Sequence, residues 1–284
     1  CGSDELIRLL GEAYLEPKRP AVFASVTFSQ YAFATRLMDA QEVTVPLKDG
    51  VHDLWEMAYL VRKHRARLCF ICNPNNPTGT YVTRADVSRF LDAIPEETLV
   101  VFDEAYVEYV DAPDFPDILS LIREGRRVVS LRTFSKIHGL AGLRVGYGIG
   151  PRDVIDALQR VRPPFNVNRV AQEAAIAALQ DREHQELSRR VNREQRERLT
   201  QQFASMGLKV YPSQANFIWV DLGTPADGVY RALLERGVIV RQGRPFGCPS
   251  ALRISIGTPE QNERLINALA AALELAATKG ELGA

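Results

Sequence analysis

Short apolar runs alternate with amphipathic stretches along the first half of the chain. The apolar runs Ala21–Val26, Leu68–Cys72 and Thr98–Phe102 are rich in residues that favour strands. In the stretches between such runs, apolar residues recur every three or four positions, which indicates helices. This alternation predicts a mainly parallel sheet with helices on both faces. The further elements expected here are strands at Glu42–Pro46 and Arg127–Leu131 and helices at Ser29–Met38, His52–Arg65, Thr83–Ala93 and Asp117–Glu124.

The pattern changes after Pro163 and Pro164. Two helices are predicted at Asn168–Gln180 and Asp181–Met206, and a smaller α+β unit follows them. We therefore expect an α/β fold with two domains, a large domain over residues 1–162 and a small C-terminal domain over residues 163–284. The strands expected in the small unit are Leu208–Tyr211, Asn216–Asp221, Val238–Arg241 and Leu252–Ile256, and its helices are Ala226–Arg236 and Pro259–Ala277.

The charge balance argues against a nucleic-acid partner. Lys plus Arg and Asp plus Glu are each 35, so the formal net charge is zero, whereas a polyanion binder needs a basic surface. The arginines of the long helix at Asp181–Met206 are interleaved with glutamates, which is typical of a solvated helix face. A local basic surface on that helix is the alternative interpretation.

Neither a membrane segment nor a metal site is predicted. No apolar run approaches the roughly 20 residues of a membrane-spanning helix, and no secretory signal is visible at the start of the sequence. Cys69 and Cys72 have the spacing of a redox pair or half a zinc site. Because they lie in a predicted buried strand and no second pair completes a site, we interpret them as core residues. A reducing, cytoplasmic compartment fits this cysteine usage.

Polar side chains follow the predicted strands at the points where the strands end, which is where ligands bind in such sheets. Asn73, Asn75 and Asn76 follow one strand and could donate hydrogen bonds to a ligand, although a simple loop is the alternative. Asp103 follows the next strand, where an unpaired buried carboxylate is costly. Asp103 is either an N-cap for a following turn or a partner for a cationic ligand that Tyr106 could also reach.

A third cluster follows the strand at Arg127–Leu131. Lys136 stands there among apolar and small residues, which can lower the pKa of a lysine. Such a lysine can form a Schiff base with a carbonyl compound. The hydroxyl groups of Thr133 and Ser135, together with Arg144, would suit a phosphate. Taken singly, each of these residues also fits an ordinary cap or surface position.

Ser3 and Asp4 precede an apolar stretch that predicts a helix. Each could be an ordinary helix cap, but free N–H groups at a helix start also bind phosphate. The sequence thus contains a Schiff-base lysine, a phosphate site, an aspartate for a ring nitrogen, and a tyrosine with an asparagine for a ring hydroxyl. These are the groups that pyridoxal 5'-phosphate requires, so we predict it as the cofactor.

Several motifs resemble those of the fold type I pyridoxal-phosphate aminotransferases, and among these the histidinol-phosphate aminotransferases. The motifs are Gly2–Ile7, Thr27–Tyr31, Asn75–Gly79, Asp103–Tyr106, Arg132–Lys136, Gly142–Arg144 and Leu252–Gly257. The resemblance covers essentially the whole chain. It implies an exchange of the amino group between L-histidinol phosphate and 2-oxoglutarate in histidine biosynthesis. It also implies a homodimer whose active sites lie at the subunit interface.

The resemblance implies a role for each matching residue. Lys136 corresponds to the lysine that binds the cofactor covalently and moves a proton during catalysis, and Asp103 to the carboxylate that pairs with the ring nitrogen. Tyr106 and Asn76 correspond to the residues that hydrogen-bond the ring 3-oxygen, and Phe28 to the aromatic residue that stacks on the ring. The phosphate-binding set corresponds to Ser3, Asp4, Thr133, Ser135 and Arg144.

The substrate groups implied by the resemblance are Arg253, for the α-carboxylate, and Asn76. Arg241 corresponds to a second arginine, at the substrate phosphate or the edge of the carboxylate. Relatives usually have a further N-terminal segment before the position that matches Gly2, which this sequence lacks. Two alternatives therefore stand beside the main hypothesis: an aromatic amino acid aminotransferase, and a truncated, inactive aminotransferase-like chain.

Overall fold

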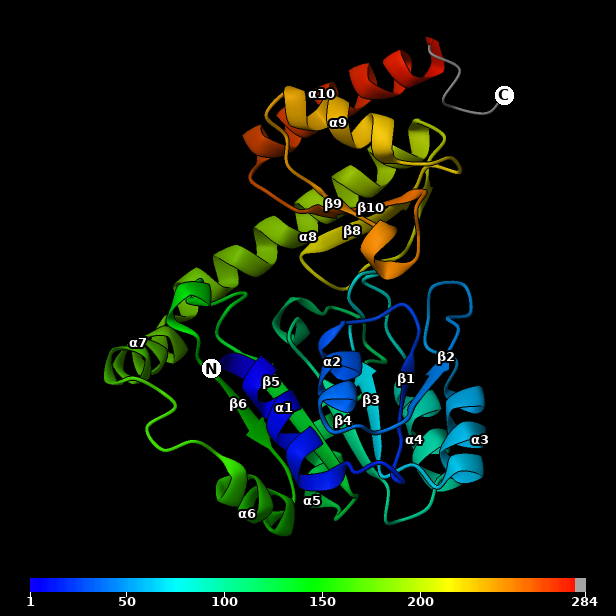
Figure 1. Cartoon of the computed structure of the whole chain (residues 1–284). Coiled ribbons are helices and arrows are strands. Elements are labelled where there is room, and N and C mark those ends of the chain that lie inside the picture. The colour runs from blue at the N-terminus through cyan, green and yellow to red at the C-terminus, as the bar shows by residue number, and fades with distance from the viewer. Residues whose placement is uncertain (279–284) are drawn as a thin grey trace.

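The computed structural model describes residues 1–278 and contains two sheets. One has six strands in the order β2-β1-β3-β4-β5-β6, and the other has four in the order β7-β8-β10-β9. Figure 1 shows the larger sheet in the lower part of the molecule and the smaller sheet above it. The strands are β1 (Ala21–Ala24), β2 (Glu42–Val45), β3 (Leu68–Cys72), β4 (Leu99–Asp103), β5 (Val128–Thr133), β6 (Gly146–Ile149), β7 (Lys209–Val210), β8 (Phe217–Asp221), β9 (Arg241–Gln242) and β10 (Ala251–Ser255).

The larger sheet is parallel except for β6, which pairs antiparallel with β5 at one edge. Cys72 pairs with Asp103, and Asp103 with Leu131, so β3, β4 and β5 end at nearly the same level. The chain segments that leave these strands therefore start side by side. The helices of this part are α1 (Gly2–Tyr14), α2 (Gln30–Leu37), α3 (Leu54–His64), α4 (Arg84–Ala93), α5 (Ile118–Arg123) and α6 (Arg152–Val161).

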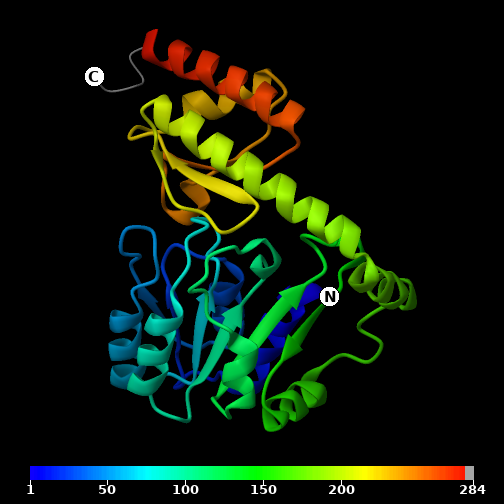
Figure 2. The same cartoon turned by 180° about the vertical axis from the view of Figure 1, so that it is seen from behind.

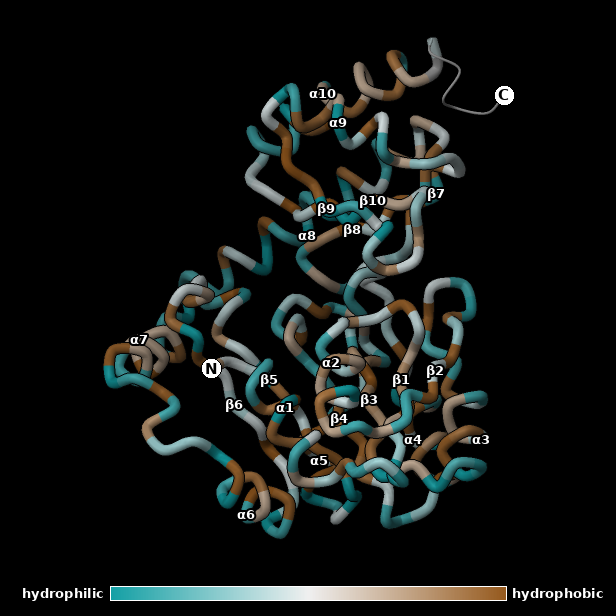
Figure 3. The backbone as a smooth tube through the Cα atoms, in the orientation of Figure 1, coloured by the Kyte–Doolittle hydropathy of each residue, from teal (hydrophilic) through white to brown (hydrophobic). Residues whose placement is uncertain are grey.

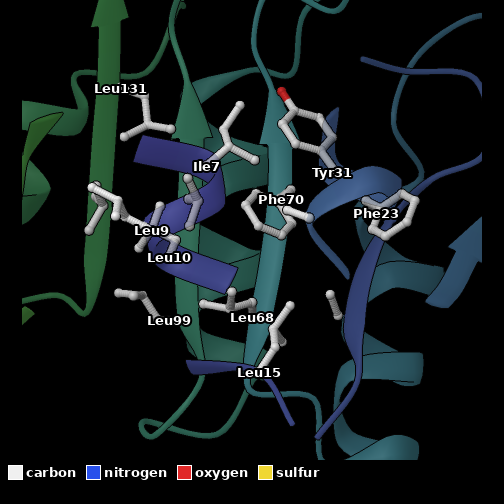
Figure 4. Close-up of a cluster of buried hydrophobic side chains, with 14 of the residues drawn as sticks. Ile7, Leu9, Leu10, Leu15, Phe23, Tyr31, Leu68, Phe70, Leu99 and Leu131 are labelled. Carbon is white, nitrogen blue, oxygen red and sulfur yellow. The ribbon is translucent and has the colours of Figure 1, made fainter. Parts of the chain in front are cut away.

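Helices cover both faces of the larger sheet, as the alternating pattern predicts. Successive residues of a strand point to opposite faces, so Leu68, Phe70 and Cys72 pack with α1 and α2, as Figure 4 shows for the first two. Cys69 and Ile71 pack with α3 and α4 on the other face, which Figure 2 presents toward the viewer. The interpretation of both cysteines as buried core residues is confirmed.

The C-terminal part begins with α7 (Arg169–Gln180) and α8 (Arg182–Ser205), and α8 runs from beside the larger sheet to the smaller one (Figures 1 and 2). The smaller sheet is antiparallel throughout. Its apolar face packs on α8, α9 (Asp227–Glu235) and α10 (Pro259–Thr278). In Figure 3 most of α8 is hydrophilic, and only a few of its positions, such as Leu199 and Phe203, enter this core. The predicted α/β fold with a smaller α+β part is confirmed.

Three elements differ from the sequence-based expectation. Strand β6 was not predicted because two of its four residues are glycines, which weaken strand patterns. Helix α6, whose buried residues Val154 and Leu158 are four positions apart, was not predicted either. The strand expected at Val238–Arg241 is wrong except at its last residue, since β9 comprises only Arg241–Gln242. The division of the chain at residue 163 stays a prediction.

Among residues 1–278, no helix is long and apolar enough to cross a bilayer. In the same range, no group of three or more His, Cys, Asp or Glu side chains is arranged to hold a metal ion.

Candidate active site

A cavity of about 280 Å³ opens at the carboxyl ends of β3, β4 and β5. Segments that are far apart in the sequence meet there, because the ends of parallel strands share one edge of the sheet. The candidate residues that line it are Ser3, Asp4, Phe28, Asn76, Asp103, Tyr106, Thr133, Ser135, Lys136, Arg144 and Arg253. Asn73 and Asn75, which were candidates too, are buried outside this lining and bond within the protein, Asn73 to the backbone N–H of Val82 and Asn75 to Thr27 and Thr78. Arg241 lines a second cavity instead, which shares Arg253 with the first.

Lys136 follows β5 and is mostly buried in the cavity wall. Its Nζ atom lies 5.2 Å from the centre of the Tyr106 ring. Burial lowers the pKa of Lys136, the positive charge of Arg253 lowers it further, and the negative charge of Asp103 acts in the opposite direction. A lowered pKa increases the uncharged fraction of the amine, which is the form that attacks a carbonyl carbon.

Asp103 is the last residue of β4 and is 3% exposed. Its Oδ2 accepts a hydrogen bond from the Tyr31 hydroxyl (2.8 Å) and its Oδ1 accepts one from the backbone N–H of Ala105 (3.3 Å). Burial raises the pKa of Asp103 to about 6, although the Tyr31 hydrogen bond acts to lower it. Within residues 1–278 this carboxylate forms no ion pair, so it is available to a cationic group of a ligand.

A chain of contacts connects the two parts of the molecule across the cavity. The Nη1 group of Arg253, on β10, donates a hydrogen bond to Oδ1 of Asn76 (2.5 Å). The Arg253 guanidinium lies 5.1 Å from the centre of the Phe217 ring. The Phe217 ring in turn meets Tyr106 edge-on at 5.0 Å. Arg253 is thereby held over the large-sheet residues with its remaining N–H groups available to an anion.

One end of the cavity lies beside the start of α1, where Ser3 and Asp4 line it. An added Cβ on Gly146 would lie 2.8 Å from the backbone nitrogen of Ser3, so glycine is what lets α1 approach β6 this closely. Arg144 forms an ion pair with Asp4 (3.2 Å). Because a carboxylate repels a phosphate, Asp4 can serve such a group only through its backbone N–H and by holding Arg144. Thr133 donates a hydrogen bond to Ser135 between their hydroxyl oxygens (2.9 Å).

Two residues that contact the candidate site were missed by the sequence analysis. Tyr31 donates to Asp103, and Phe217 contacts both Tyr106 and Arg253. Aromatic residues at apolar positions of a helix or a strand look like ordinary core residues, and both are indeed buried. The signal available for Tyr31 was its place in the motif Thr27–Tyr31, three residues after Phe28; Phe217 gave no comparable signal.

Comparison with known proteins identifies the class. The family model for aminotransferase class I and II matches residues 1–269, and the chain belongs to this family. It is 50% identical to the histidinol-phosphate aminotransferase of Moorella thermoacetica, over 94% of this chain and 69% of that one. It is 46% identical to the histidinol-phosphate aminotransferase of Halalkalibacterium halodurans, over 95% of this chain and 73% of the relative.

A solved structure supports the same grouping. The histidinol-phosphate aminotransferase of Sinorhizobium meliloti, in complex with pyridoxal-5'-phosphate, is 31% identical and matches with a TM-score of 0.89. The match covers 96% of this chain and 75% of that one. The resemblance drawn from the sequence motifs is thereby confirmed.

Proposed function

We propose that the protein is a pyridoxal-phosphate-dependent aminotransferase. It transfers the amino group of L-histidinol phosphate to 2-oxoglutarate, giving imidazole-acetol phosphate and L-glutamate, in histidine biosynthesis. The observation that carries this proposal is the single cavity in which Lys136, Asp103 and Arg253 meet. The names of the relatives support the choice of substrate.

The cavity fits the cofactor at both ends. A buried carboxylate without a cationic partner, Asp103, suits a protonated ring nitrogen, because pairing offsets its desolvation. At the other end, the first turn of α1, Ser135 and Arg144 offer N–H, hydroxyl and guanidinium donors to a phosphate. When bound, pyridoxal 5'-phosphate supplies an electron sink for the carbon from which a proton is removed.

The residues between these ends act on the ring and on the proton. Lys136 would hold the cofactor through its Nζ atom, and its free amine would remove the proton from Cα of the donor. Tyr106 and the Nδ2 group of Asn76, which line the same cavity, would donate to the ring 3-oxygen. Burial raises the pKa of Tyr106, which keeps its hydroxyl protonated as a donor. Phe28, also in the lining, would pack against the ring.

Arg253 and Arg241 form the substrate end. Their cavities adjoin and share Arg253, so two guanidinium groups face one region. L-Histidinol phosphate carries a phosphate and no carboxylate, whereas 2-oxoglutarate carries two carboxylates. A fork of N–H donors can bind either kind of oxyanion with two hydrogen bonds. Arg253 therefore serves both substrates in turn, and Arg241 holds the outer anionic group.

Assembly and location form part of the same proposal. Exposed apolar side chains stand on α2 (Phe33 and Leu37) and α7 (Val170, Ile176 and Leu179), which is typical of a surface that a partner covers. Phe33 also lines a cavity that includes Arg144, next to the candidate active site. We expect a homodimer that buries these side chains.

All four cysteines are free, which suits a reducing cytoplasm. The two sheets with separate cores support two domains, residues 1–162 and 163–284.

An absorbance experiment tests the proposal. The purified chain is loaded with pyridoxal 5'-phosphate, and L-histidinol phosphate is then added without an acceptor. We expect the visible band of the bound cofactor to be replaced by the near-ultraviolet band of its amino form, and 2-oxoglutarate to restore it. Faster conversion with phenylalanine or tyrosine would instead favour an aromatic amino acid aminotransferase. A chain that binds no cofactor would overturn the proposal.

A further inference from the structure

Tyr31, on α2, is fully buried beneath the candidate active site. Its ring stacks on Phe70 of β3, with ring centres 4.8 Å apart and planes 8° from parallel. Figure 4 shows the hydroxyl of Tyr31 directed toward the end of the sheet where the cavity opens. There it donates the 2.8 Å hydrogen bond to Oδ2 of Asp103. Phenylalanine would fill the same space in the core, so the hydroxyl group that tyrosine adds acts on the carboxylate of Asp103.

The same ring also supports Phe28. The centres of the two rings lie 5.9 Å apart and their planes are nearly perpendicular, at 84°. Phe28 lines the cavity, whereas Tyr31 does not. Tyr31 therefore contacts, from behind, two residues of the cofactor site: the carboxylate for the ring nitrogen and the aromatic residue for the ring face.

The groups that surround Asp103 determine how much its hydrogen bond with Tyr31 matters for the charge of the carboxylate. The charged and titratable groups that face Asp103 are Tyr31 from α2, Cys72 from β3, Asp4 from α1, Tyr106 after β4 and Lys136 after β5. Burial raises the pKa of the Cys72 thiol, so this neighbour carries no charge at neutral pH. Burial likewise raises the pKa of Tyr31 far above its usual value, so its hydroxyl remains a donor. Besides Tyr31, the Asp103 carboxylate receives only the longer bond from Ala105 among the described residues.

We propose that Tyr31 is a positioning residue of the cofactor site, which keeps the Asp103 carboxylate ionised and oriented toward the ring nitrogen and fixes Phe28 against the ring. This inference rests on the proposed function. Tyr31 touches neither cofactor nor substrate and acts through the two residues that do. A hydrogen bond to a carboxylate favours its ionised form, so removing it should raise the pH at which Asp103 becomes charged.

The test is the variant Tyr31→Phe, which removes one oxygen atom and keeps the ring. The probe is pyridoxamine 5'-phosphate, which has no aldehyde and so binds without a bond to Lys136. Its dissociation constant is measured by calorimetry across the pH range in the wild type, in Tyr31→Phe and in Tyr14→Phe, a control at the far end of α1. We expect the pH at which affinity falls to move upward by about one unit in Tyr31→Phe. At the wild-type midpoint, binding is then roughly fivefold weaker, and well below that pH it is about tenfold weaker.

A double-mutant cycle with Asp103→Asn separates the hydrogen bond from a general effect on packing. Because the amide introduced by this change cannot ionise, adding Tyr31→Phe to that variant should leave both the affinity and its pH dependence unchanged. A second variant, Tyr31→Leu, also removes the ring that contacts Phe28. We expect it to weaken binding further, at high pH as well as at low pH.

Two results would overturn the inference. One is a Tyr31→Phe protein with the same pH midpoint as the wild type. The other is a loss of affinity of the same size in the Asp103→Asn background. A wild-type protein that does not bind pyridoxamine 5'-phosphate at all would instead overturn the proposed function, so the two failures are distinguishable.

Discussion

The two sheets contribute to the candidate site in different ways. The larger, parallel sheet supplies groups from residues at or just after strand ends, such as Asp103 and Lys136. The smaller, antiparallel sheet supplies Arg253 from the middle of β10, between Leu252 and Ile254, which are both buried in its core. In the parallel sheet, topology alone gathers polar residues at one edge. In the antiparallel sheet, the alternation of side chains sends a single residue toward the cavity.

This difference matches a division of chemical tasks. The residues proposed to hold the cofactor and move the proton lie in the part with the larger sheet, and the residues proposed to bind substrate anions lie mainly in the part with the smaller one. Changes in the first part should therefore affect cofactor binding and the rate of chemistry. Changes in the second should affect substrate affinity and leave the cofactor in place. The predictions below test that division, beginning with the largest effect.

The largest effect is expected for Lys136→Ala. This change removes both the covalent attachment and the base, so we expect turnover to fall by about 10⁴-fold, the upper end of the contribution of one base. Steady-state kinetics with L-histidinol phosphate and 2-oxoglutarate measure the loss, and circular dichroism checks the fold. Lys18→Ala, at an exposed position, is the control. A variant that keeps a tenth of the wild-type rate or more would contradict the assignment of Lys136.

The next effect concerns stability of the part with the smaller sheet. Phe203, on α8, is fully buried in its core, and Phe203→Ala should lower the free energy of unfolding by about 3–5 kcal/mol because it leaves a cavity. Urea unfolding is followed by the fluorescence of the buried Trp219 on β8, in a background where the exposed Trp55 is replaced by Phe. In the absence of urea, the affinity for the cofactor should be unchanged. Weaker cofactor binding would contradict the proposed division of tasks between the two parts of the molecule.

For Arg253→Lys we expect a loss in kcat/KM of roughly 10²-fold. Lysine keeps the charge but loses the planar fork that binds two oxygens of an anion. The dissociation constant of pyridoxamine 5'-phosphate, measured in parallel, should not change. Arg244→Lys is the matched control, because Arg244 pairs with Asp227 on the surface of the same part. Equal losses in substrate and cofactor affinity would contradict the proposed division.

The smallest effect expected is that of pH, and it arises in the part with the larger sheet. Asp103 must be ionised to pair with the ring nitrogen, and its pKa is raised to about 6 by burial. Affinity for pyridoxamine 5'-phosphate should therefore be full above pH 7 and fall as the pH drops through about 6, by about tenfold per pH unit below it. In Asp103→Asn the affinity should be lower at neutral pH, and the part of its pH dependence that is due to Asp103 should vanish. An identical profile in both proteins would remove Asp103 from this role.

Much of this architecture could be predicted because the hydrophobic periodicity of each segment agrees with its place in an alternating series of strands and helices. The strand Leu68–Cys72 has the bounds that the pattern predicts, and the helices around it, Leu54–His64 and Arg84–Ala93, begin and end within two residues of theirs. Lys136 and Asp103 could be found from the rule that ligands bind at strand ends. Strand β6 could not be found in this way, because Gly146 is selected by the close approach of α1, a contact between distant segments. Tyr31 and Phe217 were missed because only the folded structure shows that the first bonds to Asp103 and the second lies against Arg253.

The hydrogen bond between Arg253 and Asn76 has a consequence for selectivity. A substrate that enters this cavity does not meet a free guanidinium group but one already bonded to a neutral amide. Because one N–H group is held by that amide, the remaining N–H groups of the guanidinium are fixed in direction before an anion arrives. An oxyanion gains charge-assisted hydrogen bonds from these donors, whereas an uncharged molecule gains none. The free site therefore favours charged substrates over uncharged ones, because one of the protein's own side chains already orients its anion-binding group.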